Sequence, residues 1–147
     1  MYAFERVAMT YEEWEAQVPD VIKTDNVWRV KAYQLSLFLF DLAWHDVSVL
    51  LRNRRMHDIA DQLCRATARI SASVIEGYSR DTGKARSTFY EYALGSARES
   101  RDWYYKGRHG LKPDVVRHRM DLCTEIAKLT LRMIANERRT NRRPGRS

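Results

Sequence analysis

The chain has 147 residues, the size of one ordinary domain, of which 44% are hydrophobic and 31% charged. These proportions are typical of a folded protein and exclude an intrinsically disordered chain. With only six glycines and three prolines, the composition favours a few long helices over a sheet of many short strands.

The net charge of +7 is spread unevenly along the chain. Residues 1–25 carry six acidic and two basic side chains, a net −4, whereas residues 138–147 carry five arginines and no acid, a net +5. Residues 26–137 hold the remaining +6 and are therefore basic in their own right. Such a distribution favours a polyanionic partner, in the first place nucleic acid.

Nothing in the sequence predicts a membrane span or a secretion signal. The most apolar stretch, residues 35–44, is ten residues long and includes Asp41, whereas a membrane span needs about 20 residues. The first 19 residues are acidic and contain no apolar run. Cys64 and Cys123 lie in apolar helical patterns, which favours reduced core thiols in a cytoplasmic protein, with a single disulfide as the alternative.

The first predicted element is short. Thr10 followed by Glu13 resembles a helix-capping box and predicts a helix over residues 11–17. A first long helix is predicted from Asp25 or Asn26, either of which can cap it, to about residue 53. Its apolar residues cover most of the helix circumference, which indicates burial on more than one side and contact with another subunit.

Three more helices are predicted over residues 58–75, 84–106 and 113–137, each with apolar residues at helical spacing. Gly77 is placed to end the second of them in a left-handed turn, which glycine adopts without steric cost. The last helix has two adjacent apolar stripes, and the second stripe suggests a partner surface. The third helix contains small residues that would let a neighbouring helix approach closely: Gly95, Ser96 and Ala97.

Four long helices joined by short loops predict an all-α fold, an antiparallel up-down-up-down four-helix bundle. The predicted organisation is an acidic N-terminal segment with a short helix (residues 1–25), the bundle (26–137) and a basic, mobile C-terminal tail (138–147). Subunit contacts are expected on the first and last long helices.

Three stretches of the chain carry motifs that resemble those of one known protein family, in the same order as in that family. Residues 27–32 read VWRVKA and include Trp28, and residues 92–99 read YALGSARE. Between them, residues 62–80 include a Glu-Gly pair, with Ser73 and Ile75 where the family usually has Asn and Ala. The motif residues of the second and third stretches are Glu76, Gly77, Gly95, Ser96 and Glu99.

Together these motifs cover about residues 27–133 and resemble the small bacterial family of four-helix bundle proteins, also called 23S rRNA intervening-sequence proteins. The resemblance implies an all-α bundle without known catalysis, encoded in some cases inside inserts in ribosomal RNA genes. It also implies kinship in fold with the accessory variability determinant of diversity-generating retroelements, a basic pentamer that binds nucleic acid and a reverse transcriptase. The partners that it implies are further copies of the chain, up to a pentamer, nucleic acid and a reverse transcriptase.

The cations of the chain predict a nucleic-acid-binding surface. In an antiparallel bundle, the loops after the first and third long helices share one end, and clustered cations with nearby aromatic rings attract phosphates and stack on unpaired bases. The residues predicted at that end are Arg52, Arg54, Arg55, Tyr104, Tyr105, Lys106, Arg108 and Lys112. The residues predicted at the opposite end are Arg80, Lys84, Arg86, Arg138, Arg139, Arg142 and Arg143.

Arginines near helix C-termini also interact favourably with the helix dipole without binding any ligand. This is the alternative interpretation of several of these residues. No base-reading motif is present, so binding of low sequence specificity is expected. For Glu76 and Glu99, a polar network or a partner contact is one reading, and an ion pair with Arg65, Arg69 or Arg98 that sets the helix register is the favoured one.

Catalytic and metal-binding patterns are missing from the sequence. A di-iron bundle needs Glu-x-x-His pairs, and none of the four histidines has a Glu three residues before it. Asp41 and His45 lie four residues apart and could share a helix face, but two ligands do not make a metal site. No phosphate-binding glycine loop, dinucleotide fingerprint, zinc spacing or nucleophile elbow occurs. The prediction is a protein that is not an enzyme and has no cofactor or metal.

The predicted function is that of a homo-oligomeric basic accessory protein that binds RNA or DNA and supports a reverse transcriptase. The alternative is an interaction scaffold for a retroelement or ribosomal protein, without direct binding of nucleic acid. The acidic segment 1–25 favours the alternative, because it could dock on a basic partner.

Overall fold

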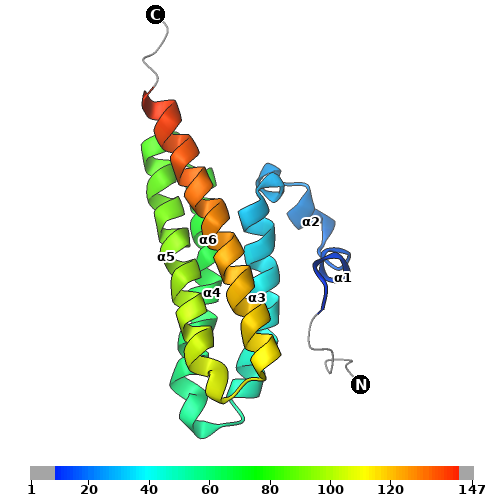
Figure 1. Ribbon diagram of the computed structural model, residues 1–147. Coiled ribbons are helices and arrows are strands. Elements are labelled where there is room, and N and C mark those ends of the chain that lie inside the picture. Colours follow the sequence, from blue (N-terminus) through cyan, green and yellow to red (C-terminus); the bar gives the residue numbers. More distant parts are fainter. Residues whose placement is uncertain (1–8, 143–147) are drawn as a thin grey trace, which may run out of the picture.

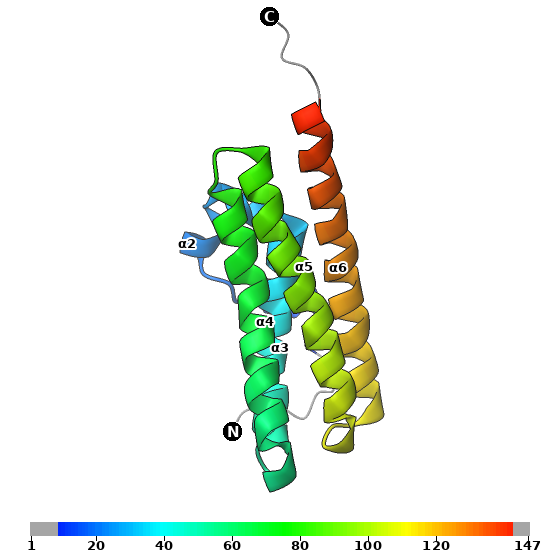
Figure 2. The same cartoon turned by 90° about the vertical axis from the view of Figure 1, so that its left-hand side faces the viewer.

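The computed structural model describes residues 9–142, with side chains described up to Thr140. All regular structure in this part of the chain is helical, which confirms the predicted all-α class. Four long helices form an antiparallel up-down-up-down bundle (Figures 1 and 2), in which each helix packs against the next and α3 closes on α6 through a smaller contact. These helices are α3 (Lys31–Leu50), α4 (His57–Tyr78), α5 (Gly83–Lys106) and α6 (Pro113–Arg142).

The bundle core consists of large aliphatic side chains at helical spacing. Leu39, Leu50, Leu63, Ile70 and Ile126 are fully buried. Each such side chain contributes roughly 2 kcal/mol when it is removed from water. The predicted periodicity therefore identified the four long helices.

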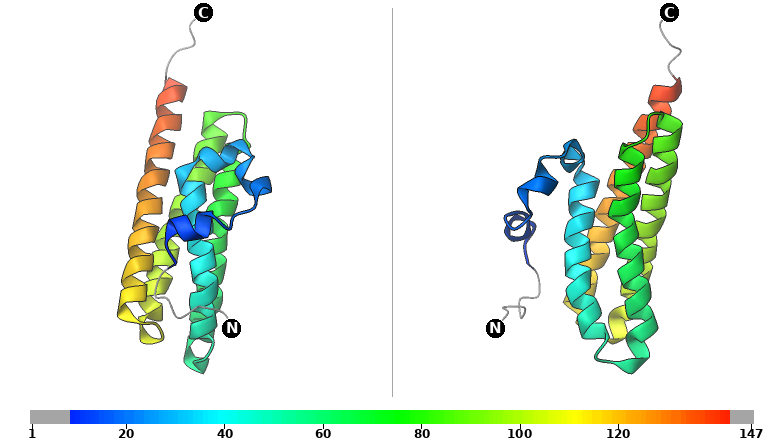
Figure 3. Two further views of the ribbon diagram at one scale, coloured as in Figure 1. Left: turned by 90° about the vertical axis from the view of Figure 1, so that its right-hand side faces the viewer. Right: turned by 180° about the vertical axis from the view of Figure 1, so that it is seen from behind.

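Short helices precede the bundle and connect its long helices. Before the bundle lie α1 (Tyr11–Glu15), α2 (Asp20–Lys23) and the 3₁₀ helix η1 (Asn26–Arg29). Residues 9–29, here called the strap, run along the outer side of α3 (Figure 3). The 3₁₀ helices η2 (Arg54–Met56) and η3 (Gly107–His109) lie in the turns at one end of the bundle.

The start of the strap has the predicted capping box. The Oγ1 atom of Thr10 accepts a hydrogen bond from the Glu13 amide, and the Thr10 amide donates to the Glu13 carboxylate, each at 3.2 Å. Asp25 also acts as a cap, because its side chain accepts from the Val27 amide at 3.0 Å. The helix that Asp25 caps is η1, since Val30 is extended and separates η1 from α3. The first long helix is therefore shorter than predicted at both ends.

The strap covers part of the second apolar face of α3. Trp14 is only 5% exposed and packs against Trp28 and Phe38, with ring centroids 6.2 and 5.5 Å apart. Its indole Nε1 donates to the Asp41 carboxylate at 2.6 Å. The wide apolar surface of the first long helix is thus partly buried within one chain. Trp44, on the same helix, is not covered and is 63% exposed.

Gly77 does not end its helix in a left-handed turn, and that prediction is wrong. No described residue has a positive φ, and α4 continues to Tyr78. A Cβ atom at position 77 would lie 2.7 Å from the ring of Tyr90 and 2.9 Å from Cβ of Phe89. Glycine is needed here because α5 approaches the backbone of α4 closely.

Gly95 differs from its prediction as well. It is exposed, and a Cβ atom there would meet nothing within 4 Å, whereas the adjacent Ser96 and Ala97 are buried. Of these three small residues, only Ser96 and Ala97 face a neighbouring helix in the bundle.

The last helix, α6, continues to Arg142, past the predicted end at residue 137. The first half of the predicted tail is therefore helical. The two cysteines are free thiols, Cys64 half-buried and Cys123 buried, as the favoured prediction had it. Among the described helices, none has the length and apolar character of a membrane span.

Candidate functional site

Six of the predicted cations gather at one end of the bundle, here called the basic loop end. The turn between α3 and α4 and the turn between α5 and α6 lie side by side at this end (Figure 1), as the antiparallel topology predicted. All six side chains are exposed. They are Arg52, Arg54, Arg55, Lys106, Arg108 and Lys112.

These cations differ in what they contact. Lys106 pairs with Asp102 at 2.7 Å and lies over the ring of Trp103, while Arg108 lies 4.0 Å from the ring centroid of Tyr105. An exposed pair such as Lys106–Asp102 contributes less than about 1 kcal/mol and gives way readily to a phosphate. The remaining four have no ion pair with any described residue: Arg52, Arg54, Arg55 and Lys112.

The two tyrosines predicted beside these cations have different environments. Tyr105 is 51% exposed, and the guanidinium of Arg108 lies over its ring. Tyr104 is fully buried, and its hydroxyl donates to Asp46 at 2.8 Å. Tyr104 cannot stack on a base, so its assignment to the nucleic-acid surface is wrong. Consecutive helical residues point about 100° apart, which places one tyrosine in solvent and the other in the core.

The opposite end of the bundle holds the second predicted set, and Arg86 acts there as a structural clamp. Its Nε donates to Glu137 at 3.0 Å, and its Nη1 donates to the carbonyls of Arg80 and Asp81, both at 3.0 Å. The hydrogen bond to Glu137 is the main cause of a raised Arg86 pKa. Arg86 thus ties the α4–α5 turn to α6 and has little freedom to bind phosphate.

Other cations of this end are also engaged. Arg138 pairs with Glu91, Arg139 donates to Asn136, and Arg80 lies over the ring of Phe89. Lys84 is exposed and has no ion pair with a described residue. The predicted side chains of Arg142 and Arg143 lie outside the described residues. Among the described residues, the basic loop end therefore has more cations without an ion pair than the opposite end.

A buried ion pair, not predicted from the sequence, links three helices of the core. Asp46 and Arg119 are each 2% exposed. Arg119 Nε donates to Asp46 Oδ2 at 2.8 Å, and its Nη2 donates to Oδ1 at 3.3 Å. The hydroxyl of Tyr104 shares Oδ2, so the cluster joins α3, α5 and α6. Burial and the neighbouring carboxylate raise the pKa of Tyr104 well above its usual value.

His118 extends this cluster toward solvent. Its Nδ1 accepts from Arg119 Nη1 at 2.8 Å, because a guanidinium can only donate. Partial burial, with Arg119 next to it, lowers the His118 pKa below its usual value of 6.5. The neutral imidazole is therefore the form that fits this site.

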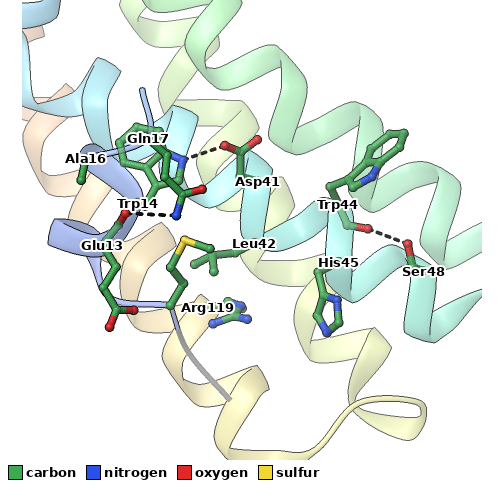
Figure 4. A pocket seen from close by; sticks show the side chains of 11 residues that line it. Glu13, Trp14, Ala16, Gln17, Asp41, Leu42, Trp44, His45, Ser48 and Arg119 are labelled. Atoms are coloured by element: carbon green, nitrogen blue, oxygen red, sulfur yellow. Dashed lines mark hydrogen bonds between the residues drawn. The ribbon is translucent and has the colours of Figure 1, made fainter. Parts of the chain in front are cut away.

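A groove of about 890 Å³, here called the strap groove, opens between the strap, α3 and α6 (Figure 4). Its wall is mostly apolar and includes Trp14 and Leu42, and Arg119 reaches it from α6. Asp41 and His45, which the sequence places on one helix face, both line it. Asp41 accepts a hydrogen bond from Trp14. No group of three potential metal ligands occurs among the described residues.

The two family-like acids have modest structural roles. Glu99 pairs with Arg69 across α4 and α5 at 3.9 Å and accepts from the Trp103 indole at 3.2 Å, which confirms the favoured prediction for Glu99. Glu76 is exposed and has no ion pair with a described residue, so the same prediction is wrong for Glu76.

Comparisons with known proteins agree with this fold. The sequence model of the 23S rRNA-intervening sequence protein family matches residues 29–132. A crystal structure of a protein of unknown function from the S23 ribosomal protein family of Bacteroides thetaiotaomicron superposes with a TM-score of 0.66 and 18% sequence identity. The similarity covers 70% of this chain and 97% of that chain, and shows a common fold. No curated protein matches the chain. Because the family match runs through all four bundle helices, the chain belongs to the 23S rRNA-intervening sequence protein family.

Proposed function

We propose that the protein binds nucleic acid with low sequence specificity, without catalysis, and that the basic loop end is its phosphate-binding surface. The observation that carries the proposal is the group of four exposed cations there that have no ion pair with a described residue. Phosphates need no more than such a cluster, and neutralising each of them releases counterions. The described residues hold no group of three potential metal ligands, and the sequence carries no known catalytic motif, so no feature favours an enzyme.

Structured ribosomal RNA is the first ligand to test, because the description of the family names 23S rRNA. Single strands and duplex DNA serve as comparison ligands. Contacts to phosphates position a protein without reading bases, so affinities for unrelated sequences of equal length should agree within about tenfold.

The decisive experiment compares two triple variants with the same change in charge. The site variant is Arg52→Ala, Arg54→Ala and Arg55→Ala, and the control is Arg65→Ala, Lys128→Ala and Arg132→Ala, whose side chains are exposed on α4 and α6. In filter binding at low salt, the site variant should lose about tenfold or more in affinity. The control should lose much less, because its cations are spread over the bundle. Equal losses would mean that net charge alone attracts the ligand, and the basic loop end would then have no special role.

We also propose that the protein self-associates through α3 and α6. After the strap is in place, Trp44 on α3, Leu51 directly after α3 and Leu131 on α6 remain more than 40% exposed. Exposed apolar side chains of this size favour contact with another copy. Light scattering gives the number of subunits, for which the family resemblance suggests five, and Trp44→Lys should shift it toward the monomer. A monomer at all concentrations would contradict this part of the proposal.

A further inference from the structure

A second cavity, of about 440 Å³, lies at the end of the bundle opposite the basic loop end and is here called the tyrosine pocket. All four long helices or the residues next to them contribute to its wall, with Val30 before α3, Tyr78 on α4, Tyr90 on α5 and Met133 on α6. Its volume is within the range of about 300–1,000 Å³ that is usual for ligand sites. The pocket shares no residue with the strap groove or the basic loop end.

The wall contains a buried hydroxyl group without a partner. Tyr90 is only 4% exposed, and its hydroxyl has no hydrogen bond with any described residue. Among the described residues, every completely buried polar side-chain atom does have a partner, so the Tyr90 hydroxyl must reach the open space of the pocket. Burial and the neighbouring Glu137 carboxylate raise the pKa of Tyr90, so this hydroxyl stays protonated and can donate as well as accept.

An ion pair in the same wall places a donor next to an acceptor. Nε of Arg86 donates to Oε1 of Glu137 at 3.0 Å, and the pair has no net charge. The other hydrogen bonds of Arg86 come from Nη1. Nη2 of Arg86 and Oε2 of Glu137 thus have no hydrogen bond with a described residue. A neutral ligand with both acceptors and donors meets complementary groups here, whereas an anion or a cation meets a charge that is already neutralised.

The rest of the wall favours a flat ligand. The rings of Tyr78 and Tyr90 and the side chains of Val30 and Met133 are apolar surfaces. A nucleobase combines apolar faces, which stack on aromatic rings, with an edge of hydrogen-bonding groups. On guanine this edge has the O6 acceptor beside two donor groups, the N1–H and the exocyclic amine. An arginine can only donate and a carboxylate can only accept, so the Arg86–Glu137 pair matches this order of groups.

We propose that the tyrosine pocket binds a guanine base. The base stacks on the ring of Tyr78, its O6 accepts from Nη2 of Arg86, and its two donor groups reach Oε2 of Glu137 and the Tyr90 hydroxyl. Free guanosine and an unpaired guanosine of an RNA strand carry the same base. The proposal is independent of the phosphate contacts at the basic loop end, because free guanosine has no phosphate.

The test adds guanosine, adenosine or uridine to the full chain with isotope-labelled tyrosine rings, followed by nuclear magnetic resonance. Guanosine should move the ring signals of Tyr78 and Tyr90 and leave the signal of Tyr105, at the other end of the bundle, in place. Adenosine has an acceptor nitrogen where guanine has the N1–H, so the Glu137 carboxylate loses a donor. Adenosine should therefore bind about tenfold more weakly or less.

Removal of a single hydroxyl locates the binding. Tyr90→Phe should weaken guanosine binding about three- to tenfold, as expected for the loss of one hydrogen bond. The fold should be unaffected, because this hydroxyl has no hydrogen bond with a described residue. The matched control is Tyr105→Phe, which also removes a hydroxyl without such a bond and should leave guanosine binding unchanged.

Glu137→Gln tests the order of donor and acceptor groups. The glutamine keeps a carbonyl oxygen for Nε of Arg86 but has an amide N–H₂ in place of the second oxygen. This group donates, so it repels the N1–H of guanine and suits the acceptor nitrogen of adenine. The variant should bind guanosine about tenfold or more weakly and should bind adenosine more tightly than guanosine. Partial unfolding would weaken both nucleosides and could not reverse the preference.

Two hairpin RNAs distinguish the source of the base. They differ at one position of the loop, which is guanosine in one RNA and uridine in the other. Tighter binding of the guanosine hairpin that Tyr90→Phe abolishes identifies an unpaired guanosine of RNA as the ligand. Binding of guanosine alone, with equal affinity for the two hairpins, identifies the free nucleoside.

Two results would overturn the proposal. One is that neither guanosine nor the guanosine hairpin moves the signals of Tyr78 and Tyr90. The other is binding of guanosine that Tyr90→Phe and Glu137→Gln leave unchanged. Neither result bears on the basic loop end, which the Arg52, Arg54 and Arg55 triple variant tests separately.

Discussion

At the scale of single residues, the buried Asp46–Arg119 ion pair is the feature of the core that should tolerate substitution least. Both side chains are buried, and Tyr104 and His118 satisfy further hydrogen-bonding positions around them. The pair connects α3 with α6, the two helices with the smaller contact in the bundle. It therefore joins these two helices, although the net contribution of such a pair to stability is small.

Removing one partner of this ion pair should destabilise the protein strongly. Asp46→Ala leaves the Arg119 guanidinium buried without a counterion, so the free energy of unfolding should fall by about 3–5 kcal/mol. Urea unfolding followed by circular dichroism measures the change. The double variant Asp46→Leu with Arg119→Met should recover most of the loss, because two apolar side chains leave no unpaired charge. A loss below about 1 kcal/mol for Asp46→Ala would show that water reaches the pair.

His118 predicts how stability depends on pH. Its pKa in the folded protein lies below the value of 6.5 for an unperturbed histidine. Between these two pKa values the unfolded chain binds more protons, so stability rises with pH there and is complete above about 6.5. The melting temperature should therefore fall as the pH drops from 7.5 to 5. His118→Gln removes this titration, and an unchanged pH profile in that variant would assign the effect to other groups.

At the scale of helices, two glycines test how closely α4 and α5 approach. Gly77→Ala puts a methyl group within 3 Å of Phe89 and Tyr90, and forcing such a group into a packed interface costs about 1–3 kcal/mol. Gly95→Ala, the control, meets no neighbour within 4 Å and should stabilise α5 by about 0.5–1 kcal/mol. Thermal unfolding of the two variants should shift in opposite directions. Equal shifts would contradict the close approach at Gly77.

The strap is a second element, and we expect it to unfold separately from the bundle. It is held to α3 by Trp14 and by the hydrogen bond of the Tyr11 hydroxyl to Gln34. Trp14→Ala should release the strap and leave the bundle folded, because α1 packs mainly against α3 and the largest contacts of the bundle are between its own long helices. Hydrogen exchange should then lose protection over residues 11–16 and keep it over residues 60–74. Loss of protection in both regions would show that the strap and the bundle unfold together.

At the scale of the whole molecule, charge is divided between an acidic strap and a basic bundle. Phosphate contacts make affinity fall linearly with the logarithm of salt concentration, by about 0.9 per contact on duplex DNA. The Arg52, Arg54 and Arg55 triple variant should therefore lower that slope by about 3. Titrations between about 50 and 200 mM salt measure it. An unchanged slope would mean that these arginines do not touch phosphate.

The sequence alone determined the fold class, the four helices, their order and the end at which the two basic turns meet. These follow from periodicity and from the geometry of antiparallel helices, which are local properties of the chain. The capping box at Thr10 was predictable for the same reason, since both hydrogen bonds connect residues three apart. The family motifs could be recognised for the same reason, because each lies within one continuous stretch of the chain.

Only the tertiary structure decided which polar side chains are buried and which cations are available. Asp46 and Arg119 are 73 residues apart, and no local pattern pairs them. The roles of Tyr104, Arg86 and Gly77 were misjudged because each depends on a neighbour from another helix. The strap groove likewise exists only because the strap folds back on α3. Contacts between segments distant in the chain depend on how the helices pack, and that packing is a property of the whole fold.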